Sequence, residues 1–377
     1  MLKCKKISNI IVIISFFVII TVPQILFVFL KSSIPQDTSE NRKLAEKPVF
    51  NLENIENYSS NYENYYNDNL PFRGMIRNAW TNFNFYLLNE STTSQVLIGK
   101  NEGDISSSWL FFQDEAEGSN SIKDAQGILT FSDEGLEQIK ENITKNTTEL
   151  EGRNIKVLYA LIPNKANLYK EKLPDNITIY EDETRFDKLE KYLKEKEIKN
   201  FIYLKDALLN AKEINDVYYK QDTHWNNFGA FIGFKEILNQ IEEEYNNFEY
   251  NMKISEEKLM DKDLTQMSGI KNVLKDKEIT IEYMPDITYW ETVFETENKI
   301  VITQSDNAPI HKTLFVVGDS FRTAMIPYFS KVYSKVVYMH RCDYGSYMLD
   351  HYQPDIIVFQ LLERYVDTLK DYKLYQK

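Results

Sequence analysis

Short apolar runs alternate with helix-like segments along most of the chain, and this alternation constrains the fold more than any other feature. Strands are predicted at 155–162, 200–204, 314–317, 336–339 and 356–361. Helices are predicted at 132–150, 185–196 and 226–242, where apolar residues recur every three or four positions. Strands that alternate with helices form a parallel sheet covered on both faces. We therefore predict the α/β class, with a three-layer α/β/α domain around a central, mostly parallel sheet.

The first 31 residues differ from the rest in composition. Lys3, Lys5 and Lys6 precede an uncharged apolar stretch at residues 7–30, which is long enough to span a bilayer. A cleavable signal peptide has a shorter apolar core and a small-residue cleavage site. We therefore expect residues 1–31 to be a cytoplasmic tail with an uncleaved transmembrane signal anchor. The lysines place residues 32–377 outside the cell membrane.

Two further regions flank the predicted core. Aromatic and aliphatic residues at helical spacing over 55–88, interrupted at 70–74, predict a helical N-terminal framework at residues 32–94. Residues 243–307 are charged and irregular, and we interpret them as an insertion at the edge of the sheet.

Ser320 is the leading candidate for a reactive side chain. It follows the strand predicted at 314–317 in the sequence Gly318-Asp-Ser320-Phe. A hydroxyl at the carboxyl end of a buried strand lies where open α/β sheets build active sites. A serine needs a base before it can act as a nucleophile. The chain offers four histidines, which are His224, His311, His340 and His351.

The four histidines are expected at different edges of the sheet, according to the strand or helix that each precedes or follows. His311 and His351 precede their strands and are expected at the edge opposite Ser320, whereas His340 follows a strand and His224 precedes a helix. Asp222 favours His224, because residues i and i+2 of an extended segment project to the same side and a carboxylate can orient the imidazole. Arg341 beside His340 disfavours an imidazolium there. An alternative stays open, in which residues 222–225 only form a turn into the helix capped by Asn226.

Composition and spacing limit the partners and cofactors. The net charge of -13, with no basic stripe, argues against nucleic acid as a partner. Asp222 and His224 are possible ligands of Zn²⁺ or Mn²⁺, but a third and fourth ligand at a recognisable spacing are missing, so we predict no metal. Gly318 lacks the glycine partners of a phosphate-binding loop, so we predict no nucleotide cofactor.

Two motifs resemble those of a known family. Gly318-Asp-Ser320-Phe after a strand, with Asp222-Thr-His224-Trp225 upstream, resembles the SGNH-hydrolase-like O-acetyltransferases of the alginate acetylation type and the DHHW protein family. Weaker matches occur in the family's order at Glu40-Asn-Arg42, Asp68-Asn-Leu-Pro-Phe-Arg73, Trp109-Leu-Phe111 and Pro163-Asn-Lys165. Ordinary SGNH hydrolases carry the Asp and His after the serine, whereas here they precede it, as in the alginate-type group. Thr223 stands where DHHW proteins have histidine.

The resemblance implies an extracellular enzyme that moves acetyl groups onto hydroxyls of a secreted or cell-surface polysaccharide through an acetyl-serine. Ser320 would be the nucleophile, His224 the base and Asp222 the residue that orients it. The backbone N–H groups of Ser320 and Phe321 are expected oxyanion donors. Further candidates for substrate contact or oxyanion support are Arg322, Tyr328, Arg341 and, more weakly, Arg364.

The resemblance also implies a donor partner and leaves two other functions open. Acetyl-CoA is cytoplasmic, so a multipass membrane O-acyltransferase is implied as the source of acetyl groups. A carbohydrate acetylesterase would use the same triad with water as the acceptor. A wall-binding or scaffold protein would keep the fold without the chemistry.

Overall fold

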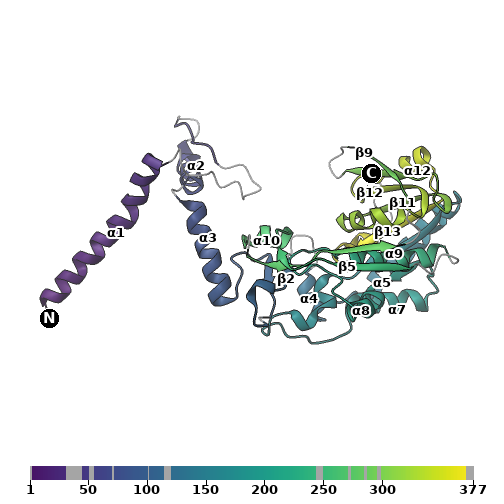
Figure 1. The fold of residues 1–377 in the computed structure, drawn as a ribbon, viewed down its shortest axis with the longest axis horizontal. Helices are drawn as coiled ribbons and strands as arrows, with labels where there is room; N and C mark the ends of the chain where they lie inside the picture. The colour runs from purple at the N-terminus through teal and green to yellow at the C-terminus, as the bar shows by residue number, and fades with distance from the viewer. Residues whose placement is uncertain are drawn as a thin grey trace. The chain divides into compact units, whose positions relative to one another are not determined.

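The chain divides into two units, residues 1–92 and 93–377, and the strands predicted for the core all lie in the second. The structure is a computed structural model. It describes residues 2–30, 45–50, 55–69, 72–100, 102–113, 120–242, 249–270, 273–283, 287–294 and 299–370. Figure 1 shows the ribbon.

Most of the described residues of the first unit are helical. Its helices are α1 (Leu2–Leu30), α2 (Ile55–Asp68) and α3 (Arg73–Phe83), the last continued by a π-helical turn at Asn84–Leu88. Helices α2 and α3 occupy the two stretches whose apolar spacing predicted them. No helix in the described part of the chain is long and apolar enough to cross a membrane, so the structure does not show the anchor predicted for residues 1–31.

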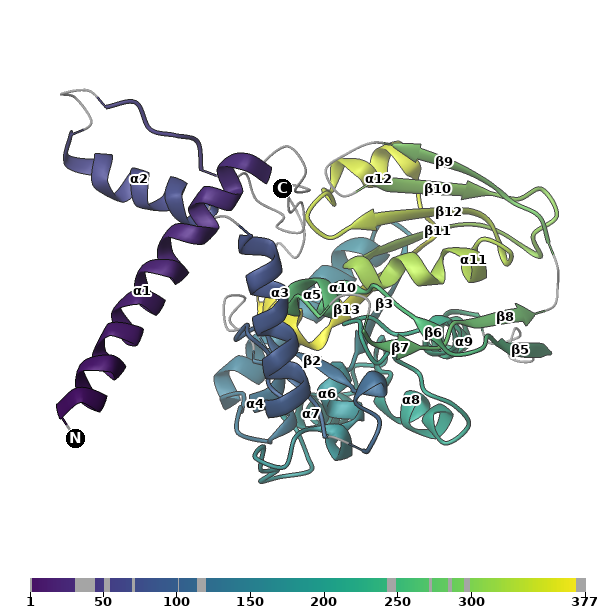
Figure 2. The same cartoon turned by 60° about the vertical axis from the view of Figure 1, so that its left-hand side comes forward.

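The second unit is organised around a seven-stranded sheet in the order β4-β3-β13-β11-β12-β10-β9. Its strands are β3 (Lys156–Ile162), β4 (Phe201–Tyr203), β9 (Trp290–Phe294), β10 (Ile300–Gln304), β11 (Ile310–Gly318), β12 (Tyr333–His340) and β13 (Ile356–Leu362). The five strands predicted from sequence pair in parallel, and β10 and β9 add an antiparallel pair beside β12 (Figure 2). The predicted mostly parallel sheet is confirmed.

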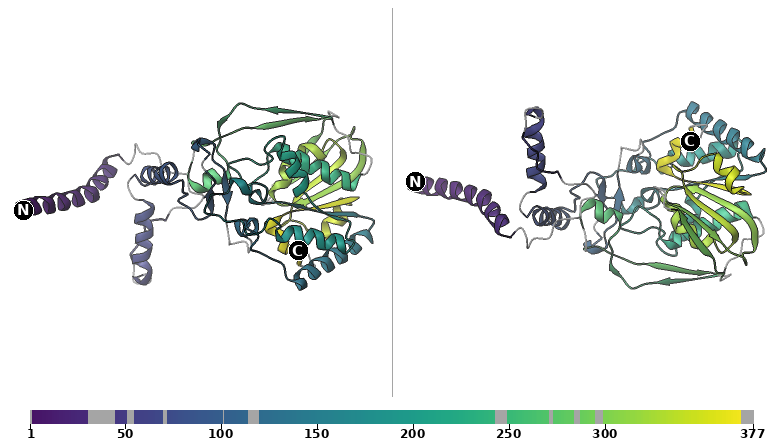
Figure 3. Two further views of the ribbon diagram at one scale, coloured as in Figure 1. Left: turned by 90° about the horizontal axis from the view of Figure 1, so that it is seen from below. Right: turned by 90° about the horizontal axis from the view of Figure 1, so that it is seen from above.

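Helices cover both faces of this sheet (Figure 3). Alternate side chains of β3 show why: Val157, Tyr159 and Leu161 pack on one face, and the residues between them pack on the other. The first face is covered by α5 (Asp133–Glu151), α7 (Arg185–Glu195) and α12 (Tyr347–Tyr352). The second is covered by α8 (Lys205–Lys212), α9 (Asn227–Ile241) and α11 (Ile326–Phe329). These layers confirm the predicted α/β/α arrangement.

Residues 243–307 do more than extend the edge of the sheet. They contain β5 (Tyr250–Ile254), β6 (Lys258–Leu259), α10 (Asp263–Ser268), β7 (Lys275–Asp276) and β8 (Ile279–Tyr283), followed by β9 and β10. The β5–β8 pair packs on α9, where the ring of Phe231 lies 4.9 Å from that of Tyr250 and 5.5 Å from that of Tyr283. Helix α10 brings a carboxylate to the candidate site described below.

Candidate active site

Ser320 lies at the turn where β11 ends, and its neighbour Asp319 fixes that turn. The Asp319 carboxylate is buried and accepts hydrogen bonds from Phe321 N (3.0 Å), Gln360 Nε2 (2.9 Å) and Leu362 N (3.0 Å). It therefore caps the short 3-10 helix Ser320–Met325 and ties it to β13. A Cβ at Gly318 would lie 2.9 Å from the Gln360 carbonyl oxygen, so this position admits only glycine. The Ser320 side chain is left exposed.

The loop before α9 brings His224 to Ser320. A β-bridge between Tyr218 and Trp225 closes this loop, and the Trp225 indole N–H donates to the Phe321 carbonyl (3.1 Å). His224 Nε2 then lies 2.7 Å from Ser320 Oγ. His224 Nδ1 lies 2.6 Å from Asp222 Oδ1, which also accepts the His224 backbone N–H (3.0 Å). The structure thus brings the three predicted residues into one hydrogen-bonded chain.

The electrostatics of the two candidate bases differ. Burial would lower the pKa of His224, but the hydrogen bond and charge of Asp222, together with Asp263 and Asp319, raise it above its ordinary value of 6.5. Burial would raise the pKa of Asp222, but His224 lowers it to about 2. By contrast, burial and the charges of Arg322 and Arg341 lower the pKa of His340. An imidazolium is therefore stabilised at His224 and disfavoured at His340.

A second carboxylate, Asp263, supports the loop and was missed by the sequence reasoning. Asp263 Oδ1 accepts the Thr223 backbone N–H (2.9 Å), and its Oδ2 accepts the Thr223 hydroxyl. Its Oδ2 also lies 3.6 Å from His224 Nδ1. Asp263 begins α10, forty residues beyond Thr223 and within irregular sequence, so no spacing pattern pointed to it.

The same carboxylates are the groups that could hold a cation. Among the residues that the structure describes, donor atoms of Asp222, His224 and Asp263 lie within 4.8 Å of one another. Both carboxylates already accept hydrogen bonds from residues 223–224, and His224 Nε2 faces Ser320. These contacts match a proton-transfer chain better than a ligand set, because a metal at Nδ1 would displace the proton that His224 shares with Asp222.

The other predicted site residues fall into two groups. Phe321 packs its ring 4.8 Å from the His224 ring, and its N–H is engaged by Asp319. Arg322 is buried, and its guanidinium donates to the carbonyls of Asp319 (2.8 Å) and Lys299 (3.3 Å). Tyr328 is buried, and its hydroxyl donates to the Asn227 carbonyl (2.8 Å). These contacts hold all three side chains in the interior.

Arg341 and Arg364 instead lie at the sheet edge that carries Ser320. Arg341 follows β12, and its backbone N–H donates to the Gly318 carbonyl (2.7 Å). Its guanidinium lies 4.1 Å from the centre of the Tyr365 ring. Arg364 follows β13 and stacks 4.9 Å from the Phe112 ring. The two arginines therefore follow the strands on either side of β11.

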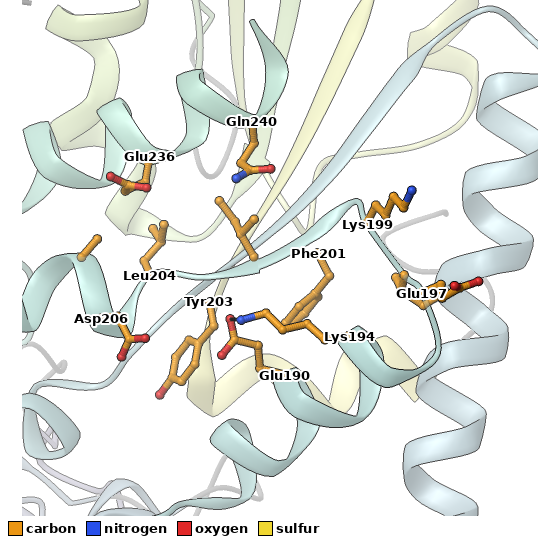
Figure 4. A pocket seen from close by; sticks show the side chains of 13 residues that line it. Glu190, Lys194, Glu197, Lys199, Phe201, Tyr203, Leu204, Asp206, Glu236 and Gln240 are labelled. Atoms are coloured by element: carbon orange, nitrogen blue, oxygen red, sulfur yellow. Dashed lines mark ion pairs between the residues drawn. The ribbon is translucent and has the colours of Figure 1, made fainter. Parts of the chain in front are cut away.

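Two cavities in the described part of the second unit differ in size and in distance from the candidate site. A cavity of about 20 Å³ adjoins the triad loop and is lined by Phe111, Phe112, Ser121, Asn164, Lys165, Ala166, Thr223 and Arg364. A larger one, of about 520 Å³, runs along β4 between α7 and α9 (Figure 4). Figure 4 shows Glu190 and Lys194 at its wall. These two side chains form an ion pair, with 2.8 Å between Lys194 Nζ and Glu190 Oε1. Ser320, His224 and Asp222 are not among its lining residues, so size alone does not mark the reactive site.

Glu363, directly after β13, is fully buried under this edge of the sheet. Its carboxyl accepts hydrogen bonds from Asn164 N (2.7 Å), Asn167 Nδ2 (2.6 Å) and the Tyr203 hydroxyl. Burial raises the pKa of Glu363 to about 8, so this carboxyl keeps its proton at neutral pH. The neutral acid pins the turn between β3 and α6 (Lys165–Leu168).

Glu363 is expected to make the free energy of unfolding depend on pH. The unfolded carboxyl loses its proton near 4.5, whereas the folded one keeps it up to about 8. The contribution of Glu363 to the free energy of unfolding is therefore at its full value below pH 4.5. It decreases by about 1.4 kcal/mol per pH unit as the pH rises from 4.5 toward 8. Glu363→Gln should remove this slope in chemical denaturation, while the exposed Glu171→Gln should keep it. Equal slopes in both variants would contradict the assignment.

The fold and the site together define an SGNH-hydrolase-like domain, with a serine after a central strand and an Asp-x-His pair upstream. Residues 105–324 match the family described as "SGNH hydrolase-like domain, acetyltransferase AlgX". This match covers more than half of the chain, so the chain belongs to that family. The resemblance noted at residues 222–225 and 318–321 is confirmed.

Several known proteins are similar to this chain. The probable alginate O-acetylase AlgJ of Azotobacter vinelandii is 25% identical over 175 residues, which are 45% of this chain and 39% of that relative. Bacillus cereus PatB1 superposes with a TM-score of 0.52 at 17% identity, covering 74% of this chain and 100% of PatB1. A DHHW family protein from Eubacterium siraeum gives 0.51 at 13%, covering 73% and 93%. At these identities the two structures establish the shared fold.

Proposed function

We propose that this protein is an O-acetyltransferase that moves acetyl groups onto hydroxyls of a secreted or cell-surface polysaccharide. The observation that carries the proposal is the hydrogen-bonded chain from Ser320 through His224 to Asp222, with atom separations of 2.7 and 2.6 Å. Membership of the AlgX acetyltransferase family supports acetyl transfer as the reaction. The name of the AlgJ relative supports a polysaccharide as the acceptor.

The proposed reaction has two halves with the same three side chains. As Ser320 Oγ attacks the acetyl carbonyl, its proton passes to His224 Nε2, which then protonates the leaving group of the donor. This leaves an acetyl ester on Ser320. A sugar hydroxyl attacks that ester while giving its proton to His224, and the Ser320 alkoxide recovers the proton as the acetylated sugar leaves. Asp222 stays ionised and holds the Nδ1–H throughout.

The oxyanion and substrate contacts are proposed from the placement of the remaining residues. The Phe321 N–H is engaged by Asp319, so the Ser320 N–H is the donor of this turn that we assign to the oxyanion. Arg341, at the same sheet edge, is our candidate for a substrate contact. Arg322 and Tyr328 make interior hydrogen bonds that support a packing role.

We also propose that the domain works outside the cell membrane and receives acetyl groups from a multipass membrane O-acyltransferase. The support is in the sequence, where three lysines precede an uncharged apolar run at residues 7–30. Protease added to intact cells should then digest residues 93–377. Protection of the domain in intact cells would contradict this location.

The acceptor decides between acetyl transfer and simple hydrolysis. We expect the purified chain, given 4-nitrophenyl acetate and oligosaccharides from the host's own extracellular polysaccharide, to yield acetylated oligosaccharide detectable by mass spectrometry. Release of acetate alone at high acceptor concentration would instead establish an esterase, because water and a sugar hydroxyl compete for the same acetyl-serine. If neither acetylated oligosaccharide nor acetate is formed, the scaffold alternative is favoured.

A further inference from the structure

Lys165 is a buried cation beside the loop that carries Asp222. It is 5% exposed and begins α6, directly after β3. Its ammonium donates to three backbone carbonyls of one short loop: Asp222 (2.7 Å), Lys220 (3.1 Å) and Tyr219 (3.2 Å). An ammonium has three N–H donors and no acceptor, so these carbonyls take all of them. The geometry gives this lysine one task, which is to hold the backbone at residues 219–222.

Other contacts hold the loop at its N–H groups. Lys220 N donates to Asp276 (2.7 Å), and Thr223 N donates to Asp263 (2.9 Å). Carboxylates thus hold these N–H groups, and Lys165 holds three carbonyls, of which that of Lys220 also accepts the Leu110 backbone N–H (2.8 Å). Burial lowers the pKa of Lys165 to about 8, although the charges of Asp263, Asp222 and Asp276 oppose the shift. The ammonium is therefore a counter-charge for three carboxylates around the loop.

The backbone turn that carries Lys165 is itself held by Glu363. Glu363 accepts the N–H of Asn164 and the side-chain amide of Asn167, one on each side of Lys165 in sequence. The ammonium also lies 5.4 Å from the centre of the Phe111 ring and 5.8 Å from that of Trp109. A buried acid, a short turn and a buried lysine therefore connect β13 to the loop that orients His224.

We propose that Lys165 is a positioning residue for the acyl transfer proposed above, fixing residues 219–222 so that Asp222 holds His224 in line with Ser320. The proposal rests on that function for its kinetic consequence. Its geometric consequence, the alignment of Asp222 with His224, can be measured without any acetyl donor.

Lys165→Met separates positioning from simple charge, because the two effects have opposite signs. Removing a nearby positive charge would by itself raise the pKa of His224. Releasing the loop would weaken the hydrogen bond from His224 to Asp222 and lower the pKa of His224. The imidazole signals of the full chain, which has four histidines, report this pKa by NMR titration. We expect it to fall in Lys165→Met while cooperative unfolding is retained.

The matched control is Lys205→Met, which removes a lysine that is 13% exposed and binds Asp187 instead. It should leave the pKa of His224 unchanged. A raised or unchanged pKa of His224 in Lys165→Met would overturn the proposal. If Lys165→Met does not fold, Lys165→Arg gives the same test with the charge kept, because a planar guanidinium cannot converge on the same three carbonyls.

Kinetics then link the positioning role to the reaction. A misplacement on the order of 1 Å lowers turnover by about 100-fold, so Lys165→Met should lower kcat by about that factor with KM nearly unchanged. If the wild type transfers no acetyl groups but the pKa of His224 still falls in the variant, the proposed function fails and the positioning role stands. A rise in KM with kcat unchanged would contradict the positioning role.

Discussion

Ser320→Ala is expected to lower the rate of acetyl transfer by about 10⁶-fold, with the fold unchanged. In the proposed reaction the hydroxyl oxygen forms the bond to the acetyl group, and it lies 2.7 Å from His224 Nε2, the proposed base. Alanine leaves no nucleophile at the end of β11. The serine is exposed, so its loss removes no packing in the core. Intact-protein mass spectrometry after a short incubation with donor should show the acetyl adduct on the wild type and none on the variant.

Ser334→Ala is the matched control for this experiment. Its hydroxyl donates to the Lys312 carbonyl, away from the triad loop in sequence and in its contacts, and its removal should leave transfer at the wild-type rate. If the host polysaccharide is still acetylated in cells whose only copy of this protein carries Ser320→Ala, the scaffold alternative is favoured. An acetyl adduct that persists in the variant would place the nucleophile on another residue.

Asp222→Asn is expected to reduce turnover by about 10⁴-fold while leaving Ser320 in place. An asparagine either turns the imidazole toward the wrong tautomer or fails to stabilise the imidazolium. The pH dependence should change as well. The proposed reaction needs a neutral His224, so the rate should be lost as the pH falls through the pKa of His224, which the carboxylates raise above 6.5 in the wild type. Removing the charge of Asp222 should move this loss to lower pH.

Asp263→Asn distinguishes the two carboxylates beside His224. Asp263 Oδ2 lies 3.6 Å from Nδ1, against 2.6 Å for Asp222, and its hydrogen bonds go to Thr223. We expect its replacement to reduce turnover much less than Asp222→Asn. The full pH–rate profiles of both variants provide the comparison. Equal losses, or a larger loss at Asp263, would show that Asp222 is not the residue that orients the base.

The sequence predicted the sheet and the three central side chains because local patterns encode them. Short apolar runs placed the parallel strands, and the direction of those strands sorted the histidines by edge. The carboxylate of Asp222 is two residues from His224, so one short segment carries both, although the structure shows bends at residues 222–224 where an extended segment was expected. The 96-residue separation of His224 from Ser320 was bridged by strand direction alone.

The residues that support the site could not be found in this way. Asp263 and Glu363 are single charged residues at no recognisable spacing, and Lys165 was noted only as part of a family motif with no role assigned. Tertiary packing brings Asp263 and Lys165 to the loop and places Glu363 beside the turn that carries Lys165. Arg322 and Tyr328 were named as candidates for substrate contact or oxyanion support. Their contacts are interior because the turn after β11 directs them into the protein, a direction that sequence distance does not reveal.

The distance in sequence between the base and the nucleophile also affects how the domain folds. His224 and Ser320 are 96 residues apart, and the Trp225 contact that positions their loop spans the same interval. Contacts that close such long loops form slowly, because chain entropy must be overcome before they are made. The hydroxyl therefore gains its base only when the two halves of the sheet have joined. A serine-reactive fluorophosphonate added during refolding should consequently label Ser320 in step with the last folding phase, which makes the active site a built-in reporter of completed folding.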